Sequence, residues 1–93
     1  MQRVIVHGLV QGVNFRSFVV DRATALRLDG WVRNLRDGTV EAVFSGLEAD
    51  VRAMVDLCHQ GPRFAEVTRV ETFPANPDDL KLRRGGEKFS RLG

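Results

Sequence analysis

Two glycines and an arginine near the start of the chain have the residue types of an anion site. Gly8 and Gly12 lie in the segment GLVQGVNFR, and Arg16 ends it. Glycine lets a loop turn its backbone N–H groups towards an anion, and a guanidinium offers forked donors that stay charged. A helical apolar period begins at Phe15, so the positive end of a helix dipole is expected at the same point. The candidate anion ligands are Gln11, Gly12, Val13, Asn14, Phe15 and Arg16. A plain turn beside a solvated arginine is the alternative, and the segment fits neither the dinucleotide nor the P-loop fingerprint.

Asn34 is the second candidate, because asparagine is depleted in strands and here falls late in one. An uncharged amide at this place can orient a water molecule beside a bound anion. The alternative is a local bond to the hairpin turn that follows. Spacing alone does not show whether Asn34 reaches the loop.

Other chemistries lack their residues. His7, Cys58 and His59 are not at metal-ligand spacing, so we expect no metal. Cys58 and His59 are adjacent in a predicted helix, where they face apart; a core cysteine and a surface histidine are expected. Ser17 and Ser45 have no evident base, so hydrolysis would proceed without a covalent enzyme intermediate.

The elements that must position these residues follow from periodicity. Strands are expected at 2–7, 31–35, 39–44 and 65–73, with Asp37-Gly38 as the turn of a hairpin. One helix is expected from Phe15 to about Leu28, with Gly30 at its exit. A second should follow a capping box of Ser45 and Glu48 and end near Gln60. The order βαββαβ predicts an α+β, ferredoxin-like split βαβ sandwich: an antiparallel sheet with two helices on one face.

Length and composition indicate the number of domains and the cellular location. The 93 residues suit one domain, expected over 1–84, with a loose tail over 85–93. A short last strand is expected at Leu80–Arg84, and EKFSR at 87–91 is a rival for it. One cysteine, a short apolar N-terminus and no stretch of about 20 apolar residues favour a cytoplasmic protein without a membrane span. The net charge of +2 mildly favours an anionic ligand.

Taken together, the two motifs resemble those of the acylphosphatase family. Seven residues match the pattern G-x-V-Q-G-V-x-F-R: Gly8, Val10, Gln11, Gly12, Val13, Phe15 and Arg16. Six match G-x-V-x-N-x-x-D/R-G-x-V-E: Gly30, Val32, Asn34, Gly38, Val40 and Glu41. The resemblance runs from about residue 3 to about 84. The chain departs from the family at Asn14, where a small residue is common, at Gly46-Leu47 and in the closing strand.

The resemblance implies a monomeric hydrolase that cleaves acyl phosphates to a carboxylate and inorganic phosphate. Arg16 and the loop amides would then bind the phosphate, and Asn34 would position the attacking water. No metal or cofactor is implied, and no nucleic acid or membrane partner. A phosphate-binding module with weak or no turnover is the first alternative. An RNA-binding domain is the second. It would need a run of stacking aromatics on the sheet, whereas the chain has no such run and no tyrosine, and Trp31 and Phe44 are expected to be core or sheet residues.

Overall fold

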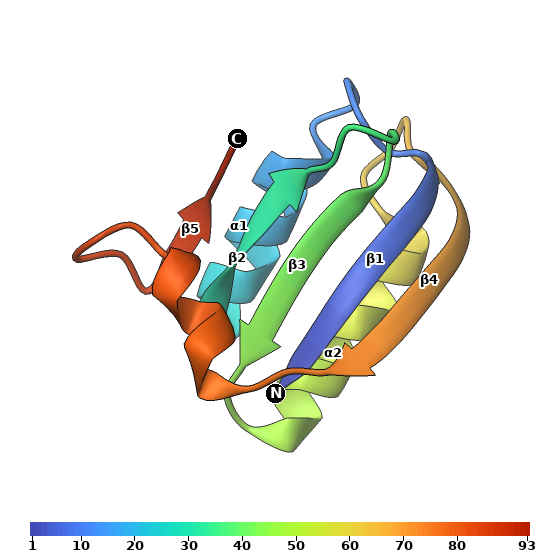
Figure 1. Ribbon diagram of the computed structural model, residues 1–93. Helices are drawn as coiled ribbons and strands as arrows, with labels where there is room; N and C mark the ends of the chain where they lie inside the picture. The colour runs from blue at the N-terminus through green and yellow to red at the C-terminus, as the bar shows by residue number, and fades with distance from the viewer.

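Five strands and two α-helices make up the fold, in a computed structural model that describes all residues 1–93 (Figure 1). In chain order the elements are β1 (Gln2–Leu9), α1 (Phe15–Ala25), β2 (Asp29–Asn34), β3 (Val40–Ser45), α2 (Glu48–Gln60), β4 (Glu66–Pro74), the 3-10 helix η1 (Pro77–Leu82) and β5 (Phe89–Arg91). The α+β class and the alternation of strands and helices are therefore as predicted.

The strands form one sheet in the order β4-β1-β3-β2-β5. The first four of these pair antiparallel, with Val4 of β1 opposite Ala42 of β3. β5 instead pairs parallel to β2, with Gly30 opposite Phe89. The sheet is therefore mixed, and the expectation of an antiparallel sheet is wrong at this edge.

The last strand comes from the rival segment. Residues 80–82, part of the expected strand at Leu80–Arg84, lie in η1. That helix begins with Pro77 and has a capping box, in which Asn76 accepts from the Asp78 N–H and Asp79 accepts from the Asn76 N–H. The strand lies at 89–91 instead, inside the segment expected to be a loose tail. For these three residues that expectation is wrong, since β5 is bonded into the sheet.

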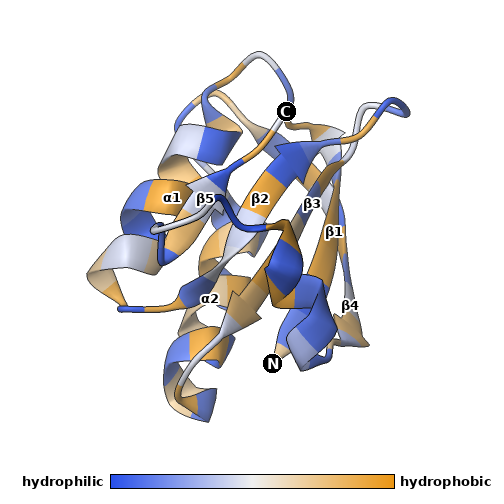
Figure 2. Cartoon of the chain, turned by 60° about the vertical axis from the view of Figure 1, so that its left-hand side comes forward, coloured by the Kyte–Doolittle hydropathy of each residue, from blue (hydrophilic) through white to orange (hydrophobic).

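Both helices cover the same face of the sheet, α1 behind β2 and α2 behind β1 and β4 (Figure 1). The central strands carry long hydrophobic stretches, and η1 is mostly hydrophilic (Figure 2). The core between sheet and helices holds Val4, Val6, Phe15, Val19, Ala23, Val32, Phe44, Val51, Met54 and Cys58. Cys58 is buried and His59 is exposed, as predicted. Neither helix has the length and hydrophobicity that crossing a membrane requires.

α1 ends earlier than expected, at Ala25 rather than near Leu28. Arg27 takes a left-handed conformation with φ of 58°, and the N–H groups of Arg27 and Leu28 return to the carbonyls of Thr24 and Ala23. This is a Schellman closure, formed without glycine. Gly30 lies in β2, where an added Cβ would come within 1.8 Å of the Val43 carbonyl oxygen.

The predicted capping box of α2 is absent. Its N-cap is Leu47, whose side chain makes no capping hydrogen bond. Ser45 belongs to β3, where it pairs with Asp29 of β2. The β2–β3 pairing therefore includes Ser45, the residue that the local pattern predicted as the N-cap of the helix.

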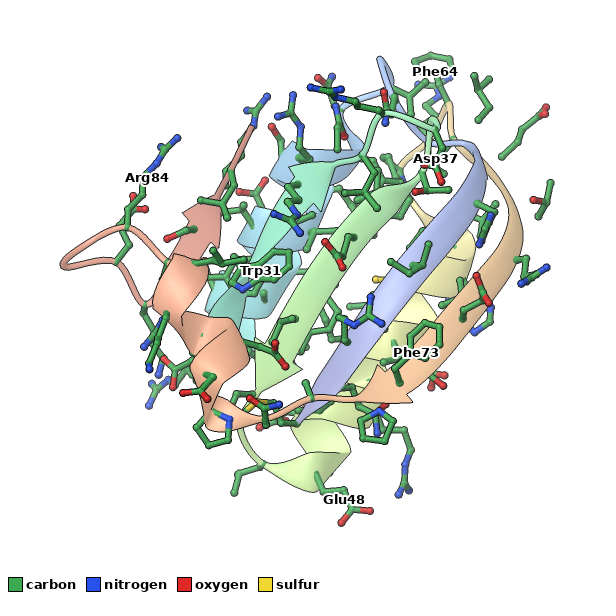
Figure 3. The ribbon with its side chains drawn as sticks, viewed as in Figure 1. Trp31, Asp37, Glu48, Phe64, Phe73 and Arg84 are labelled. Carbon is green, nitrogen blue, oxygen red and sulfur yellow. The ribbon has the colours of Figure 1, made fainter.

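On the sheet face away from the helices, η1 covers the only tryptophan. Trp31 is 2% exposed and its Nε1 donates to the Asp79 carbonyl oxygen at 2.6 Å. The guanidinium of Arg33 lies 4.9 Å from the centre of its ring. Figure 3 shows Trp31 between β2 and η1. The chain after β4 is thus held against β2 before it reaches β5.

Candidate active site

The loop between β1 and α1 has a backbone that leaves its N–H groups free. Gly12 and Asn14 have positive φ values of 77° and 66°. No backbone N–H of residues 11–17 donates a hydrogen bond within the protein, and no side chain caps α1. The first N–H groups of a helix have no partner inside it, and a run of such groups in a turn forms an anion-binding concavity. The loop therefore leaves a run of N–H groups without partners in the protein.

Asn14 explains one departure from the family pattern. Its left-handed conformation is strained for most side chains, and asparagine tolerates it better than other residues with a Cβ. The side chain makes no capping bond to α1 and lines the cavity described below. Asn14 therefore supports the turn of the loop in place of a smaller residue.

Arg16 follows the loop in the first turn of α1 and has no acidic partner. One of its terminal nitrogens donates to the Leu92 carbonyl oxygen at 3.1 Å, and no carboxylate is within ion-pair distance. The bond to the chain after β5 fixes the orientation of the guanidinium and leaves other N–H groups available. Its positive charge is not neutralised inside the protein.

Asn34 reaches the same place from the other side, as the last residue of β2. It pairs with Val40 of β3, and the chain between them closes the predicted hairpin with Gly38 at a φ of 93°. Asp37 accepts from the N–H and hydroxyl of Thr39. These bonds lower the pKa of the Asp37 carboxyl, the hydroxyl contributing most. The turn is therefore stabilised by Asp37, and no side-chain hydrogen bond joins Asn34 to it.

A cavity of about 150 Å³ brings the loop, Arg16 and Asn34 together. Its lining residues are Val10, Gly12, Asn14, Phe15, Arg16, Asn34 and Arg91. Five of these are predicted site residues. Of the other predicted residues, Gln11 and Val13 do not line it. Sequence reasoning missed Arg91, which lies on β5, and the only signal for it was the rival match EKFSR.

Gln11 has a different position from the one expected of a ligand side chain. Its Nε2 donates to the carbonyl oxygens of Leu35 at 2.7 Å and Thr39 at 2.9 Å. These two bonds tie the loop to the base of the β2–β3 hairpin. Because Asn34 lies directly before Leu35, the Gln11 side chain sets the distance between the loop and Asn34.

The side chains that line the cavity are neutral or positive. No Asp, Glu or His is among them, whereas two arginines are. Such a site attracts an anion and stabilises negative charge, but it contains no side chain suited to general acid–base catalysis near neutral pH. The lining side chains can therefore contribute positioning and charge stabilisation.

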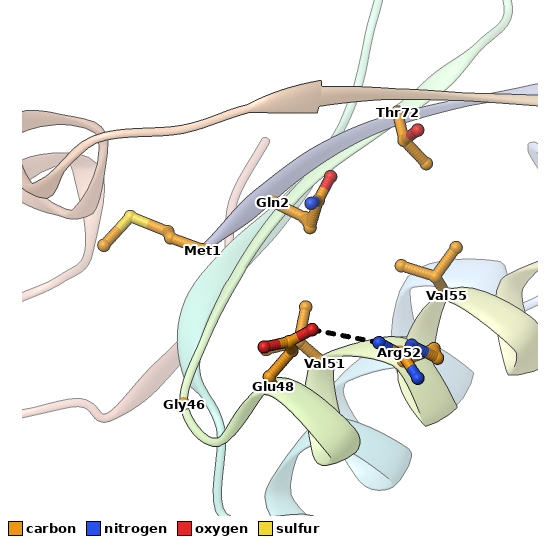
Figure 4. A pocket seen from close by; sticks show the side chains of 8 residues that line it. All are labelled: Met1, Gln2, Gly46, Glu48, Val51, Arg52, Val55 and Thr72. Carbon is orange, nitrogen blue, oxygen red and sulfur yellow. Dashed lines mark hydrogen bonds and ion pairs between the residues drawn. The ribbon is translucent and has the colours of Figure 1, made fainter.

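A second hollow lies at the opposite end of the sheet and contains none of these features (Figure 4). It is larger, about 420 Å³, and lies between the start of β1 and the first turns of α2. Its two charged side chains, Glu48 and Arg52, form an ion pair at 2.9 Å. This hollow has neither free loop amides nor an arginine without an acidic partner.

Comparisons with known proteins agree with the two motifs. The chain matches the acylphosphatase family profile over residues 2–87. It is 51% identical to an acylphosphatase of Bradyrhizobium diazoefficiens, over 97% of this chain and 91% of the relative. The crystal structure of acylphosphatase from Bacillus subtilis superimposes with a TM-score of 0.84 at 35% identity, covering 99% of this chain and 97% of that one.

An acylphosphatase structure from Coxiella burnetii gives a TM-score of 0.83 at 32% identity, covering 98% of this chain and 90% of that one. The likeness thus extends along nearly the whole chain in sequence and in structure. The resemblance seen in the two motifs is confirmed: the chain belongs to the acylphosphatase family.

Proposed function

We propose that this protein is a hydrolase that cleaves the carboxyl–phosphate bond of acyl phosphates to a carboxylate and inorganic phosphate. The curated relatives carry the name of this activity. The observation that carries the proposal is the cavity in which free loop amides, unpaired Arg16 and Asn34 meet. These are the groups needed to hold a phosphoryl group and a water molecule against each other.

In this proposal the phosphate of the substrate binds the backbone N–H groups of residues 11–16. Arg16 adds two parallel donors, which fit two phosphate oxygens and which lysine cannot reproduce. The N-terminus of α1 contributes its partial positive charge. The Gln11 side chain serves this site by holding the loop, and its backbone N–H belongs to the cradle.

Asn34 orients a water molecule for attack on phosphorus, opposite the acyl oxygen. The new bond joins the water oxygen to phosphorus, and the bond between phosphorus and the acyl oxygen breaks. The substrate phosphate takes the proton, because no lining side chain is a base, so the products are the carboxylate and dihydrogen phosphate. Positioning and charge stabilisation supply the rate, as in other phosphoryl transfers. No metal, cofactor or covalent intermediate takes part.

We also infer a ferredoxin-like topology, a monomeric state, a small-molecule partner and a cytoplasmic location. The run βαββαβ with the order β4-β1-β3-β2 supports a ferredoxin-like split βαβ arrangement, to which β5 adds an edge. Exposed large apolar side chains come from separate elements, which supports a monomer. Trp31 is buried rather than exposed for base stacking, which supports a small molecule as partner instead of a nucleic acid. The single buried cysteine supports a cytoplasmic place.

The test is hydrolysis of acetyl phosphate by the protein and by Arg16→Lys. Lysine keeps the positive charge but lacks the two parallel donors of the guanidinium. We therefore expect kcat/KM to fall by about 100-fold or more, while the melting temperature stays near that of the unchanged protein. Arg84→Lys is the matched control, because the Arg84 side chain makes no bond in the protein and points away from it (Figure 3).

Two results would count against the proposal. Hydrolysis by folded Arg16→Lys within threefold of the unchanged protein would remove Arg16 from the mechanism. Binding of inorganic phosphate without any hydrolysis would favour the binding-module alternative.

A further inference from the structure

Arg91 is a second unpaired arginine in the cavity, and the proposed mechanism does not use it. It is the last residue of β5 and lines the cavity together with Arg16 and Asn34. It makes no ion pair in the protein. No carboxylate of the protein therefore neutralises the charge that Arg91 brings to the edge of the cavity.

Hydrogen bonds to neighbouring elements restrict the position of Arg91. Its terminal nitrogen donates to the Ser17 hydroxyl of α1 at 3.0 Å. The backbone beside it is bonded as well, since the Leu92 N–H donates to the Val32 carbonyl at 2.8 Å and the Leu92 carbonyl accepts from Arg16. Because two neighbouring elements hold Arg91, little conformational entropy is lost when it binds a ligand.

Arg91 is placed for a group other than the reacting phosphate. That phosphate already has the amides of the loop, the N-terminus of α1 and Arg16. The cavity has a volume of only about 150 Å³, so a phosphate bound in it leaves room for a small acyl group, and a longer acyl part extends beyond the cavity. Arg91 is exposed although it lines the cavity, and therefore stands at the rim that a longer acyl part must pass.

We propose that Arg91 binds a second anionic group, carried on the acyl part of the substrate. The preferred substrates are then acyl phosphates of dicarboxylic acids or of other acids with a further negative charge a few atoms from the acyl carbon. This inference rests on the proposed function, since it names the substrate class of the same site. It makes Arg91 a specificity residue, whereas Arg16 serves the phosphate that all substrates share.

Succinyl phosphate and butyryl phosphate form the matched pair of probes. Both have four-carbon acyl chains, and they differ in a terminal carboxylate against a methyl group. We expect the protein to favour succinyl phosphate about tenfold in kcat/KM. A tenfold ratio corresponds to about 1.4 kcal/mol. This energy is near the low end of the range for hydrogen bonds to charged groups, as expected for a guanidinium that is exposed to water. The assay runs at low, constant ionic strength, because salt screens exposed charges.

Arg91→Gln should abolish the preference, so that the ratio of the two kcat/KM values falls about tenfold. Arg84→Gln is the control of equal charge change, and its ratio should stay that of the unchanged protein. The inhibition constant of inorganic phosphate separates the roles of the two arginines. Arg16→Gln should weaken it by a larger factor than Arg91→Gln.

Three results overturn the inference. The first is equal kcat/KM values of the unchanged protein for the two substrates. The second is an equal loss of kcat/KM for both substrates in Arg91→Gln. The third is a loss of phosphate inhibition in Arg91→Gln that is large enough to account for the whole loss of kcat/KM. The last two would make Arg91 a phosphate ligand or a structural residue. All three leave the proposed hydrolysis intact, because each is measured on an active enzyme.

A binding measurement covers the case in which neither substrate is hydrolysed, which would be a failure of the proposed function itself. Melting temperatures are compared in phosphate with added succinate or added butyrate. A larger increase with succinate, lost in Arg91→Gln and kept in Arg84→Gln, supports the inference without any turnover. Equal shifts with both acids overturn it. The same melts show whether Arg91→Gln is folded.

Discussion

Replacing Gln11 by methionine removes two hydrogen bonds and keeps the length of the side chain. The bonds run from Nε2 to the carbonyls of Leu35 and Thr39, at 2.7 and 2.9 Å. Both carbonyls keep another partner, since that of Leu35 accepts from the Gly38 N–H and that of Thr39 accepts from the Leu35 N–H. The change therefore leaves neither carbonyl without a partner, and the loss is that of two ordinary bonds.

Two ordinary bonds contribute about 1–3 kcal/mol to the free energy of unfolding. For a chain of this length each kcal/mol lowers the melting temperature by about 4–8 °C. Turnover should fall further than stability alone explains, because Gln11 joins the loop to the hairpin that ends β2 at Asn34. A displacement of about 1 Å between reacting groups can reduce a rate about 100-fold. We expect kcat for acetyl phosphate to fall about 10- to 100-fold in Gln11→Met.

Phosphate affinity should fall less than kcat. The loop amides and Arg16 lie in one continuous segment, so they keep their relative positions when the bonds to the hairpin are lost. The assay combines urea unfolding, steady-state hydrolysis and product inhibition by phosphate. Gln60→Met is the control, since Gln60 is exposed and its side chain makes no bond in the protein. Lower stability with kcat within threefold of the unchanged protein would refute the positioning argument and leave Gln11 a structural residue.

Asn34→Ala should reduce turnover about 100- to 1,000-fold and spare phosphate affinity, and a lower melting temperature with unchanged turnover would make Asn34 structural. Inorganic phosphate should stabilise the protein by roughly 2.7 kcal/mol at 100 times its Kd, whereas an equal shift in chloride of matched ionic strength would contradict a specific cradle. Burial raises the pKa of the Cys58 thiol to about 12, so thiol reagents at pH 8 should label it only as the protein unfolds; rapid labelling of the native state would refute this. Hydrogen bonds with His7, the larger cause, and with Arg69 lower the pKa of the Glu71 carboxyl from 4.5. The ionised carboxylate therefore stabilises the folded protein above pH 4.5, and this stabilisation is lost as the pH falls below that value. Glu71→Gln should flatten the decline of the melting temperature below pH 4.5, and an unchanged slope would show that Glu71 does not contribute to it.

Local patterns predicted the parts of the site that local physics determines. The loop needs left-handed residues before a helix, and Gly12, Asn14 and the apolar period from Phe15 carry that information. The hairpin needs Asp37-Gly38 between two strands. Asn34 was predicted as a candidate, but its meeting with Arg16 depends on how α1 packs on β2, which no spacing in the sequence contains.

Competition between elements explains the errors. Ser45 and Glu48 form a sound capping pattern, yet the β2–β3 ladder extends through Ser45 and its hydroxyl gives α2 no cap. The run at 80–84 looked like a strand, although Asn76 and Pro77 carry the start signal of a short helix. β5 has only three residues, so its place depends on pairing with β2. Because β5 was not predicted at this position, the place of Arg91 in the cavity and the bond from Arg16 to the Leu92 carbonyl were not predicted either.

The bond between Trp31 and η1 gives the protein a built-in optical reporter. With one tryptophan and no tyrosine, its intrinsic ultraviolet emission has a single dominant source, placed under η1 and bonded to the Asp79 carbonyl. Lifting η1 from β2 would admit water to the indole and shift the emission to longer wavelength while the rest of the sheet stays intact. The thiol of Cys58, on the buried face of α2, reacts only when the core opens. The two signals, followed in one urea titration, would therefore separate release of the segment that leads to β5 from unfolding of the whole chain.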